Sequence, residues 1–251
     1  MIERMRAVMF DFDGTLGLFR AGWMPLMLDM MMETLGPLGP DPAILRDQAE
    51  TYVARFTGKD TLHQMEPFVA QVRALGGSPL SPEEYKAEIL SRIEHRRREM
   101  TAGIESGTID PDLLLVPGSR KLLERLAARG IPLYLASGTD HGDICEDAAV
   151  LKIDHYFAGI YGSAPESLTK RELLRKIVAS GIAPNRILTF GDGRVEIEET
   201  KAAGGVAVGV ATDELECLVM DEKKRRWLLA AGADFIIPNY LEPAISVVLS
   251  A

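Results

Sequence analysis

Three short apolar runs that end in small and polar residues constrain the fold of this chain most. They are RAVMFDFDGT at 6–15, IPLYLASGTD at 131–140 and RILTFGDGRV at 186–195. Each run has the length and composition of a buried strand, and each leads into residues that suit a functional loop. Two weaker candidates follow, GGVAVGVAT at 204–212 and ADFIIP at 233–238.

Helical patterns lie between these strands. In SRKLLERLAARG (119–130) and TKRELLRKIVASG (169–181), apolar residues recur at helical spacing and a glycine ends the pattern. Alternating strands and helices imply a parallel sheet that is covered on both faces. The predicted fold class is therefore α/β, with a Rossmann-like, doubly wound parallel sheet as its core.

The interval between the first and second strands differs from the rest of the chain. From residue 18 to residue 112 there is no convincing strand, and four segments predict helices. Ser81 and Glu84 form a capping-box pattern at the start of the last one. Because the interval is too long for a loop in a compact domain, we predict an inserted all-helical cap at 18–112. The core would then comprise 1–17 and 113–251.

Composition excludes several functional classes. The chain has 251 residues and a formal net charge of -9, so any site for a polyanion must be local, and we expect no nucleic-acid partner. Cys145 and Cys217 make no disulfide framework and suit reduced thiols. No segment approaches the roughly 20 apolar residues of a membrane span. We therefore expect a cytoplasmic protein with no membrane partner.

The ends of the three clear strands carry the residues that can do chemistry. Ligands bind outside the carboxyl ends of the strands in open parallel sheets, so these loops should meet at one crevice. The residues concerned are Asp11 and Asp13 after the first strand, Ser137, Gly138 and Thr139 after the second, and Gly191, Asp192, Gly193 and Glu196 after the third.

Several acids in one crevice favour a bound divalent cation, and hard oxygen ligands suit Mg²⁺. Asp11 and Asp192 come from different strands and could bracket such an ion. Beside it, a carboxylate can attack a phosphoryl group and form an acyl phosphate. Lys170 and Ser137 could bind the remaining phosphoryl oxygens. Asp13 could protonate the leaving oxygen and then activate water.

These residues resemble the four ordered motifs of the haloacid dehalogenase (HAD) superfamily. The motifs are DFDGT at 11–15, Ser137, Lys170, and Gly191-Asp192 with Glu196. The resemblance covers nearly the whole chain and points to the phosphatase branch with an inserted helical (C1-type) cap, similar to the phosphoglucomutase and phosphoglycolate phosphatase group. It implies that Asp11 is the nucleophile and that Asp13 is the acid/base and a Mg²⁺ ligand through its backbone carbonyl. It also implies that Asp192 binds Mg²⁺ and that Glu196 contacts the ion or its water. Ser137 and Lys170 would bind phosphate.

Departures from other members of the superfamily favour hydrolysis. True dehalogenases typically lack the second aspartate, here Asp13, and the DKTGT motif of P-type ATPases is missing. Mutases of hexose phosphates generally carry a histidine soon after the first motif, and LGLFRAGWMPL has none. We expect a Mg²⁺-dependent phosphomonoester hydrolase acting on a small phosphorylated metabolite such as a sugar phosphate. A sugar-phosphate mutase and a non-enzymatic phosphate-sensing module are the alternatives.

The substrate contacts are less defined by the sequence. Gly138 and Thr139 are candidate phosphate contacts. Lys59, in TGKD, resembles a basic position that some capped relatives aim into the site, and it equally suits a turn between helices. Arg20 could reach the substrate or be structural. Two charged runs, EHRRREM at 94–100 and DEKKRRW at 221–227, are expected to be solvated helix faces.

Overall fold

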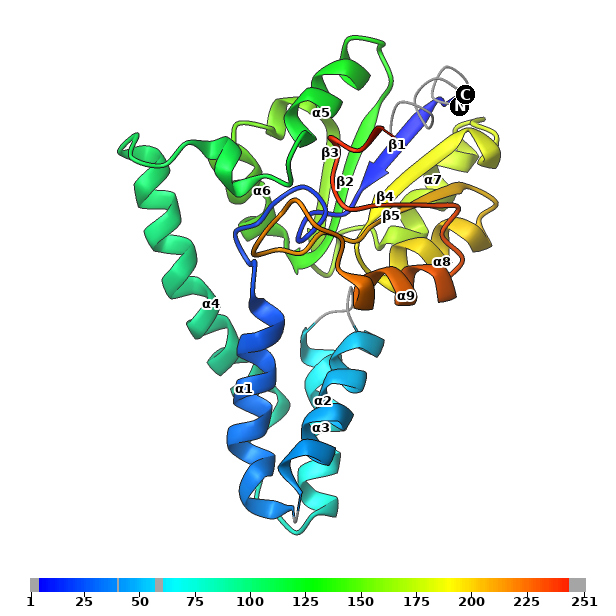
Figure 1. Cartoon of the computed structure of the whole chain (residues 1–251). Coiled ribbons are helices and arrows are strands. Elements are labelled where there is room, and N and C mark those ends of the chain that lie inside the picture. The colour runs from blue at the N-terminus through cyan, green and yellow to red at the C-terminus, as the bar shows by residue number, and fades with distance from the viewer. Residues whose placement is uncertain (1–4, 40, 57–60, 244–251) are drawn as a thin grey trace.

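Six parallel strands form the centre of the computed structural model, which describes residues 5–39, 41–56 and 61–243 (Figure 1). Their order across the sheet is β3-β2-β1-β4-β5-β6, so β1 lies at the point where the strand order reverses. The strands are β1 (Ala7–Phe10), β2 (Leu133–Asp140), β3 (Phe157–Ser163), β4 (Ile187–Gly191), β5 (Val206–Val210) and β6 (Phe235–Ile237). The predicted doubly wound α/β fold is confirmed.

Both faces of the sheet are covered because successive strand side chains point to opposite sides. Val8 and Phe10 of β1 pack in the cluster that includes α5 (Ser119–Ala127) and α6 (His141–Val150). Ala7 and Met9 pack in the cluster that includes α7 (Lys170–Ala179). The remaining helices of the core are α8 (Arg194–Ala202), α9 (Glu222–Ala230) and the short 3₁₀ segments η3 (Pro111–Leu114), η4 (Asp154–Tyr156) and η5 (Pro184–Arg186).

The edge strand β3 was not expected from the sequence. Its residues, FAGIYGS, include two glycines, and most of them are only half-buried. Strand propensity is therefore weak here. Pairing with β2 makes this segment a strand, and local sequence does not report that pairing.

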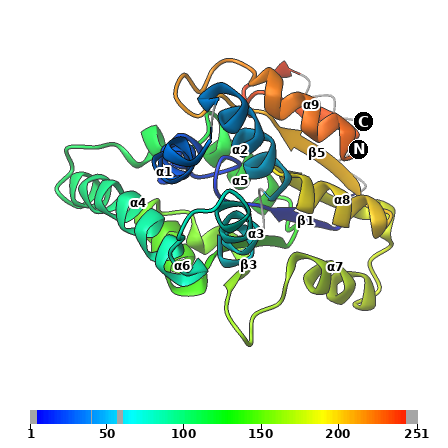
Figure 2. The ribbon, with the colours of Figure 1, turned by 90° about the horizontal axis from the view of Figure 1, so that it is seen from below.

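Four helices follow β1 and lie beyond the carboxyl ends of the strands (Figures 1 and 2). They are α1 (Trp23–Leu35), α2 (Pro42–Phe56), α3 (Thr61–Ala74) and α4 (Pro82–Glu105), with η2 (Gly36–Leu38) after α1. They enclose an apolar cluster of their own, which includes Met27, Met30 and Met31. The capping box of Ser81 and Glu84 is present at the start of α4.

Residues near both ends of the predicted cap pack against the core. Leu18 and Phe19, which the predicted division assigns to the cap, belong to the apolar cluster of the core, and so does Ile104 near the end of α4. The limits 18–112 therefore stay a prediction.

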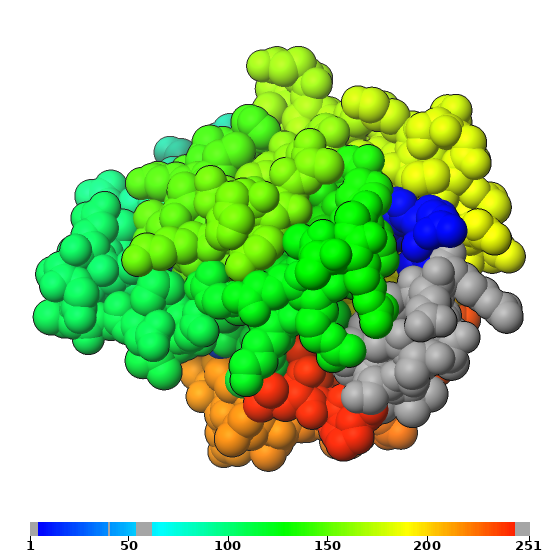
Figure 3. Space-filling view, turned by 90° about the horizontal axis from the view of Figure 1, so that it is seen from above, coloured from blue at the N-terminus to red at the C-terminus, as the bar shows by residue number. Residues whose placement is uncertain are grey.

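Figure 3 shows the end of the molecule opposite the cap, where the blue residues at the start of β1 lie beside green and yellow segments of the core.

None of the helices in the described part of the chain is long and apolar enough to cross a membrane.

Candidate active site

The carboxyl ends of β1, β2 and β4 bring the predicted catalytic residues to one place. Asp11 follows β1 directly, and its backbone N–H donates to the carbonyl of Phe190 at the end of β4 (2.9 Å). Phe12 is fully buried in the apolar cluster of the core, so it anchors the segment that carries the two acids. The chain then turns through Gly14, whose φ of +69° favours glycine. This turn holds Asp11 and Asp13 at the sheet edge.

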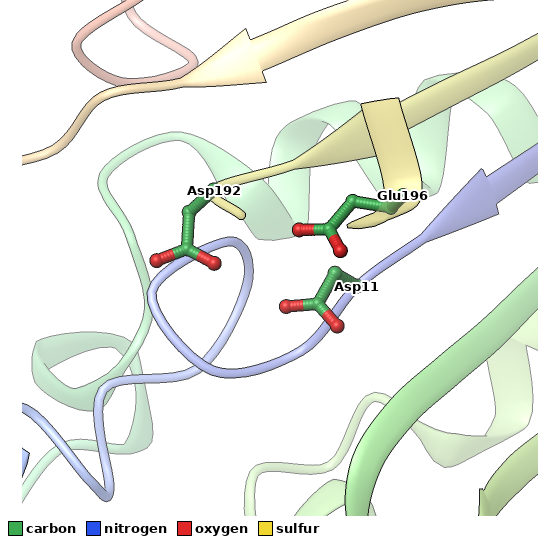
Figure 4. Close-up of side chains that lie close together, drawn as sticks. All are labelled: Asp11, Asp192 and Glu196. Carbon is green, nitrogen blue, oxygen red and sulfur yellow. The ribbon is translucent and has the colours of Figure 1, made fainter. Parts of the chain in front are cut away.

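Three buried carboxylates converge at this edge, those of Asp11, Asp192 and Glu196 (Figure 4). One oxygen of each lies within 4.8 Å of the others. Burial raises the pKa of Asp11 well above its ordinary value, against the opposing charge of Lys170, and the neighbouring acids raise it further. Burial likewise raises the pKa of Asp192 to about 6. This concentration of negative charge suits a divalent cation.

Lys170 holds two of these acids. It is the first residue of α7, at a helix start that Thr169 and Glu172 close with a capping box. Its Nζ donates to Asp11 Oδ1 at 2.6 Å and to Glu196 Oε2 at 2.9 Å. Burial alone would lower the pKa of Lys170, but the two carboxylates raise it, so the side chain stays charged. The structure therefore places Lys170 beside Asp11, the predicted nucleophile.

Both carboxylate oxygens of Glu196 accept hydrogen bonds. Besides Lys170, it accepts a hydrogen bond from the backbone N–H of Gly193 at 2.5 Å. Burial raises the pKa of Glu196, but Lys170 and these hydrogen bonds outweigh burial and hold the pKa below its ordinary value. Glu196 is therefore an ionised residue that orients Lys170.

A second buried lysine lies on the other side of the site. Lys224 of α9 donates to Asp192 Oδ2 at 2.8 Å and to Glu214 Oε1 at 2.6 Å. It is 4% exposed. The expectation that DEKKRRW is a solvated helix face is wrong for this residue, because Asp192 and Glu214 compensate its charge inside the protein. No local sequence signal distinguishes Lys224 from Lys223, its half-buried neighbour.

The second aspartate is held by two donors. Thr139 Oγ1 donates to Asp13 Oδ2 at 2.7 Å, and Arg20 donates to Asp13 Oδ1 at 3.2 Å. Arg20 also donates to Asp147 of α6 at 2.5 Å. Thr139 thus positions the candidate acid/base, and Arg20 binds two carboxylates beside the predicted substrate cavity. The sequence did not indicate Asp147.

Arg97 of α4 completes this network. It donates to Asp147 Oδ1 at 2.5 Å and to Glu146 at 2.7 Å. Arg97 is only 5% exposed, so the expectation that EHRRREM is a solvated helix face is wrong here. Its partners follow it by about 50 residues, which is why helix periodicity alone missed them.

The remaining predicted residues lie at the end of β2 or outside the described residues. Ser137 Oγ accepts a hydrogen bond from the backbone N–H of Thr139 at 3.0 Å. Ser137 and Gly138 line the cavity above Asp11. Lys59 lies outside the described residues. The roles of these residues in binding phosphate stay predictions.

A cavity of about 120 Å³ lies between the acids and the cap. On the core side it is lined by Asp11, Asp13, Ser137, Gly138, Thr139, Asp140, Asp143 and Asp192. On the side of the cap it is lined by Arg20 and by seven residues of the cap helices: Trp23, Met27, Gln64, Lys86, Ile89, Leu90 and Ile93. A substrate held here would be in contact with both parts of the molecule.

The fold is shared with solved structures of other proteins. A predicted phosphoglycolate phosphatase from Haemophilus somnus 129pt is 18% identical, with a TM-score of 0.63 and 98% coverage of both chains. A β-phosphoglucomutase from Clostridium difficile is 14% identical, with a TM-score of 0.63, and the match covers 98% of this chain and 96% of that one.

Curated relatives are similar over most of their length. The phosphoglycolate phosphatase of Escherichia coli (strain K12) is 28% identical over 220 residues, which cover 83% of this chain and 82% of that protein. The phosphoglycolate phosphatase of Synechococcus elongatus (strain ATCC 33912 / PCC 7942 / FACHB-805) is 26% identical over 233 residues, covering 92% and 96%. These relatives bear out the prediction of a phosphatase-type enzyme.

The model of the haloacid dehalogenase-like hydrolase family matches residues 5–204, a span that contains all four predicted motifs. The chain therefore belongs to the haloacid dehalogenase-like hydrolase family.

Proposed function

We propose that this protein is a Mg²⁺-dependent phosphomonoester hydrolase that acts on a small phosphorylated metabolite through an aspartyl phosphate on Asp11. The observation that carries this proposal is the arrangement around one carboxylate. Lys170 lies 2.6 Å from Asp11, and the oxygens of Asp192 and Glu196 lie within 4.8 Å. Asp13 lies on the same loop and faces the same cavity.

The donor set fits a hard divalent cation. Asp11 and Asp192 offer carboxylate oxygens, and burial disfavours their ionised forms until a cation compensates the charge. These two residues and the backbone carbonyl of Asp13 would hold the ion, while Glu196 would act mainly through Lys170. When bound, Mg²⁺ neutralises charge on the phosphoryl oxygens.

The residues divide the reaction into two steps. In the first, an Asp11 carboxylate oxygen attacks phosphorus, the bond from phosphorus to the ester oxygen breaks, and Asp13 gives a proton to the departing oxygen. In the second, Asp13 takes a proton from water, whose oxygen attacks the phosphorus of the acyl phosphate. Inorganic phosphate leaves and Asp11 is restored.

Positive charge and hydrogen-bond donors support both steps. Lys170 stays charged beside Asp11, where it stabilises phosphoryl oxygens as charge develops. Ser137 lines the same cavity and can donate its hydroxyl to a phosphoryl oxygen. Thr139 and Arg20 hold the Asp13 carboxylate in place.

Phosphate release from a broad panel of phosphomonoesters, measured with Mg²⁺ and with EDTA, tests this proposal. We expect Mg²⁺-dependent release that Asp11→Asn reduces at least 1000-fold, because an amide oxygen is a poor nucleophile. Asp29→Asn is a matched control, since Asp29 is an exposed acid on α1. Mg²⁺-dependent release by Asp11→Asn at the wild-type rate would refute the proposal. Isomerised sugar phosphate in place of free phosphate would identify a mutase instead.

Acid-quenched protein should also carry phosphate from a labelled substrate. The label should be released by hydroxylamine, which cleaves acyl phosphates, and it should be missing from Asp11→Asn. A label that persists for hours without turnover would instead indicate a phosphate-sensing module.

A further inference from the structure

The cavity above Asp11 has an apolar wall on the side of the cap. We use "apolar wall" for five side chains: Trp23 and Met27 of α1, and Ile89, Leu90 and Ile93 of α4. Trp23 and Met27 are four residues apart, and the three residues of α4 recur at spacings of one and three, so each helix turns one face to the cavity. The wall is thus a continuous feature of two helices.

The opposite side of the cavity is polar and charged. It carries the proposed nucleophile Asp11, the acid/base Asp13 and the hydroxyls of Ser137 and Thr139. A phosphoryl group must lie on this side to reach Asp11. The group that leaves with the ester oxygen must then face the apolar wall.

Few polar partners are available to that leaving group. Of the described residues of the cap helices that line the cavity, Gln64 and Lys86 have polar side chains, and Arg20, which precedes these helices, already donates to Asp13 and Asp147. A leaving group with several hydroxyls would lose its hydrogen bonds to water against the wall, whereas an apolar one would gain from burial. The wall therefore discriminates against polyhydroxylated leaving groups.

The charges around the cavity disfavour a second anionic group. The described lining has five acidic side chains, Asp11, Asp13, Asp140, Asp143 and Asp192, and two basic ones, Arg20 and Lys86. Both basic groups lie near carboxylates. Arg20 donates to Asp13 at 3.2 Å and to Asp147 at 2.5 Å, and Lys86 Nζ lies 3.9 Å from Asp140 Oδ1. Even with Mg²⁺ bound for the phosphoryl group, the described lining offers no excess positive charge to the leaving group.

The size of the cavity limits the leaving group as well. The space measures about 120 Å³ and is partly open to solvent, whereas an enclosed apolar cavity of about 150 Å³ admits benzene. Because the phosphoryl group takes part of this space, the part of the leaving group that lies against the wall must be compact.

We propose that the substrate is a phosphomonoester of a compact, predominantly apolar alcohol, a short alkyl or aryl phosphate without a second anionic group. This inference rests on the proposed function, because it assumes that the leaving group occupies this cavity during hydrolysis. It assigns the apolar wall the role of selecting the substrate, and it differs from the activity for which the curated relatives are named.

The test compares kcat/KM, in Mg²⁺, for three esters of similar size: n-butyl phosphate, glycerol 3-phosphate and phosphoglycolate. We expect n-butyl phosphate to be preferred at least tenfold over each of the others. Equal values, or a preference for either polar ester, would overturn this inference and leave the proposed function standing. Failure to release phosphate from any ester of the broad panel would refute the proposed function itself.

Variants of the wall separate selection from folding. Leu90→Gln places an amide on the wall and should lower kcat/KM for n-butyl phosphate about tenfold while leaving that for glycerol 3-phosphate unchanged or raised. Leu80→Gln is the matched control, because Leu80 is 47% exposed and does not line the cavity. It should change neither value. An equal loss for both esters in Leu90→Gln would contradict a selective role for the wall.

Discussion

Arg97 of α4 and Asp147 of α6 form a buried ion pair between the cap and the core, with Nε and Oδ1 2.5 Å apart. The second oxygen of Asp147 accepts a hydrogen bond from Arg20, which also donates to Asp13. A chain of ion pairs therefore runs from a cap helix to the proposed acid/base. It explains why two arginines from separate segments lie beside one buried carboxylate.

Arg97→Gln should destabilise the protein by about 3 kcal/mol, because removal of one partner leaves buried charge with less compensation. The free energy of unfolding in urea measures the change. The matched control is Arg98→Gln, because the Arg98 side chain is 76% exposed and pairs only with Glu94 among the described residues. Its effect should stay within about 0.5 kcal/mol. Similar losses of unfolding free energy in the two variants would show that the buried ion pair contributes no more to stability than an exposed one.

Lys224→Met should make the stability of the protein more dependent on Mg²⁺. Lys224 compensates the buried Asp192 and Glu214, so its removal should cost about 3–5 kcal/mol of unfolding free energy in EDTA. A bound cation would replace part of that charge at Asp192, and the rise in Tm on addition of Mg²⁺ should be larger than in the wild type. Lys121→Met, at an exposed lysine of α5, should leave the rise unchanged. A smaller rise in Lys224→Met would contradict this account.

Gly14→Ala should abolish activity as well as reduce stability. Gly14 has a φ of +69°, and an added Cβ would overlap with Asp192 Oδ2, so the proposed metal ligand would have to move. Gly130→Ala is a close control, since Gly130 has a φ of +67° and nothing within 4 Å of the added atom. Both variants should lose about 1–2 kcal/mol from left-handed backbone strain, but only Gly14→Ala should lose Mg²⁺-dependent phosphate release, by 100-fold or more. Loss of activity in both variants would point to backbone strain alone.

The contribution of Asp192 to stability should fall as the pH rises. Burial raises the pKa of Asp192 from 3.8 to about 6, so between these values the native state keeps a proton that the unfolded chain has lost. The stability from this group is fully present below about pH 4 and is lost as the pH approaches 6. Relative to Asp192→Asn, the metal-free wild type should lose up to about 1.4 kcal/mol per pH unit in this window. Urea unfolding in EDTA at several pH values measures the difference, and a difference that does not change with pH would refute this prediction.

Sequence patterns predicted the strands whose signals are local. The runs that became β1, β2 and β4 are apolar and end at the predicted site residues, and the interval predicted to be helical contains α1, α2, α3 and α4. The edge strand β3 was not predicted because FAGIYGS is glycine-rich and half-exposed, so its strand conformation depends on pairing with β2.

Part of the candidate site was also predictable from the sequence, because several of its residues follow strands with clear local signals. Asp11 and Asp192 were predicted to lie together because strand ends of a parallel sheet must meet at one edge. Lys170 begins a helix, and it was predicted from the order of the family motifs. Glu214, Lys224 and Asp147 were missed because nothing in their own segments indicates burial. The substrate role predicted for Arg20 remains a prediction, and the structure adds its bonds to Asp13 and Asp147.

By itself, the sequence determined the alternation of strands and helices, the inserted helical segment and the residue types at the strand ends. These properties follow from short-range periodicity and spacing, which a linear chain displays directly. Only the tertiary structure decided which charged side chains are buried and which faces of α1 and α4 close over Asp11. Burial of a charge depends on partners that are distant in sequence, as Lys224 and Asp192 illustrate, and those partners meet only when the chain has folded.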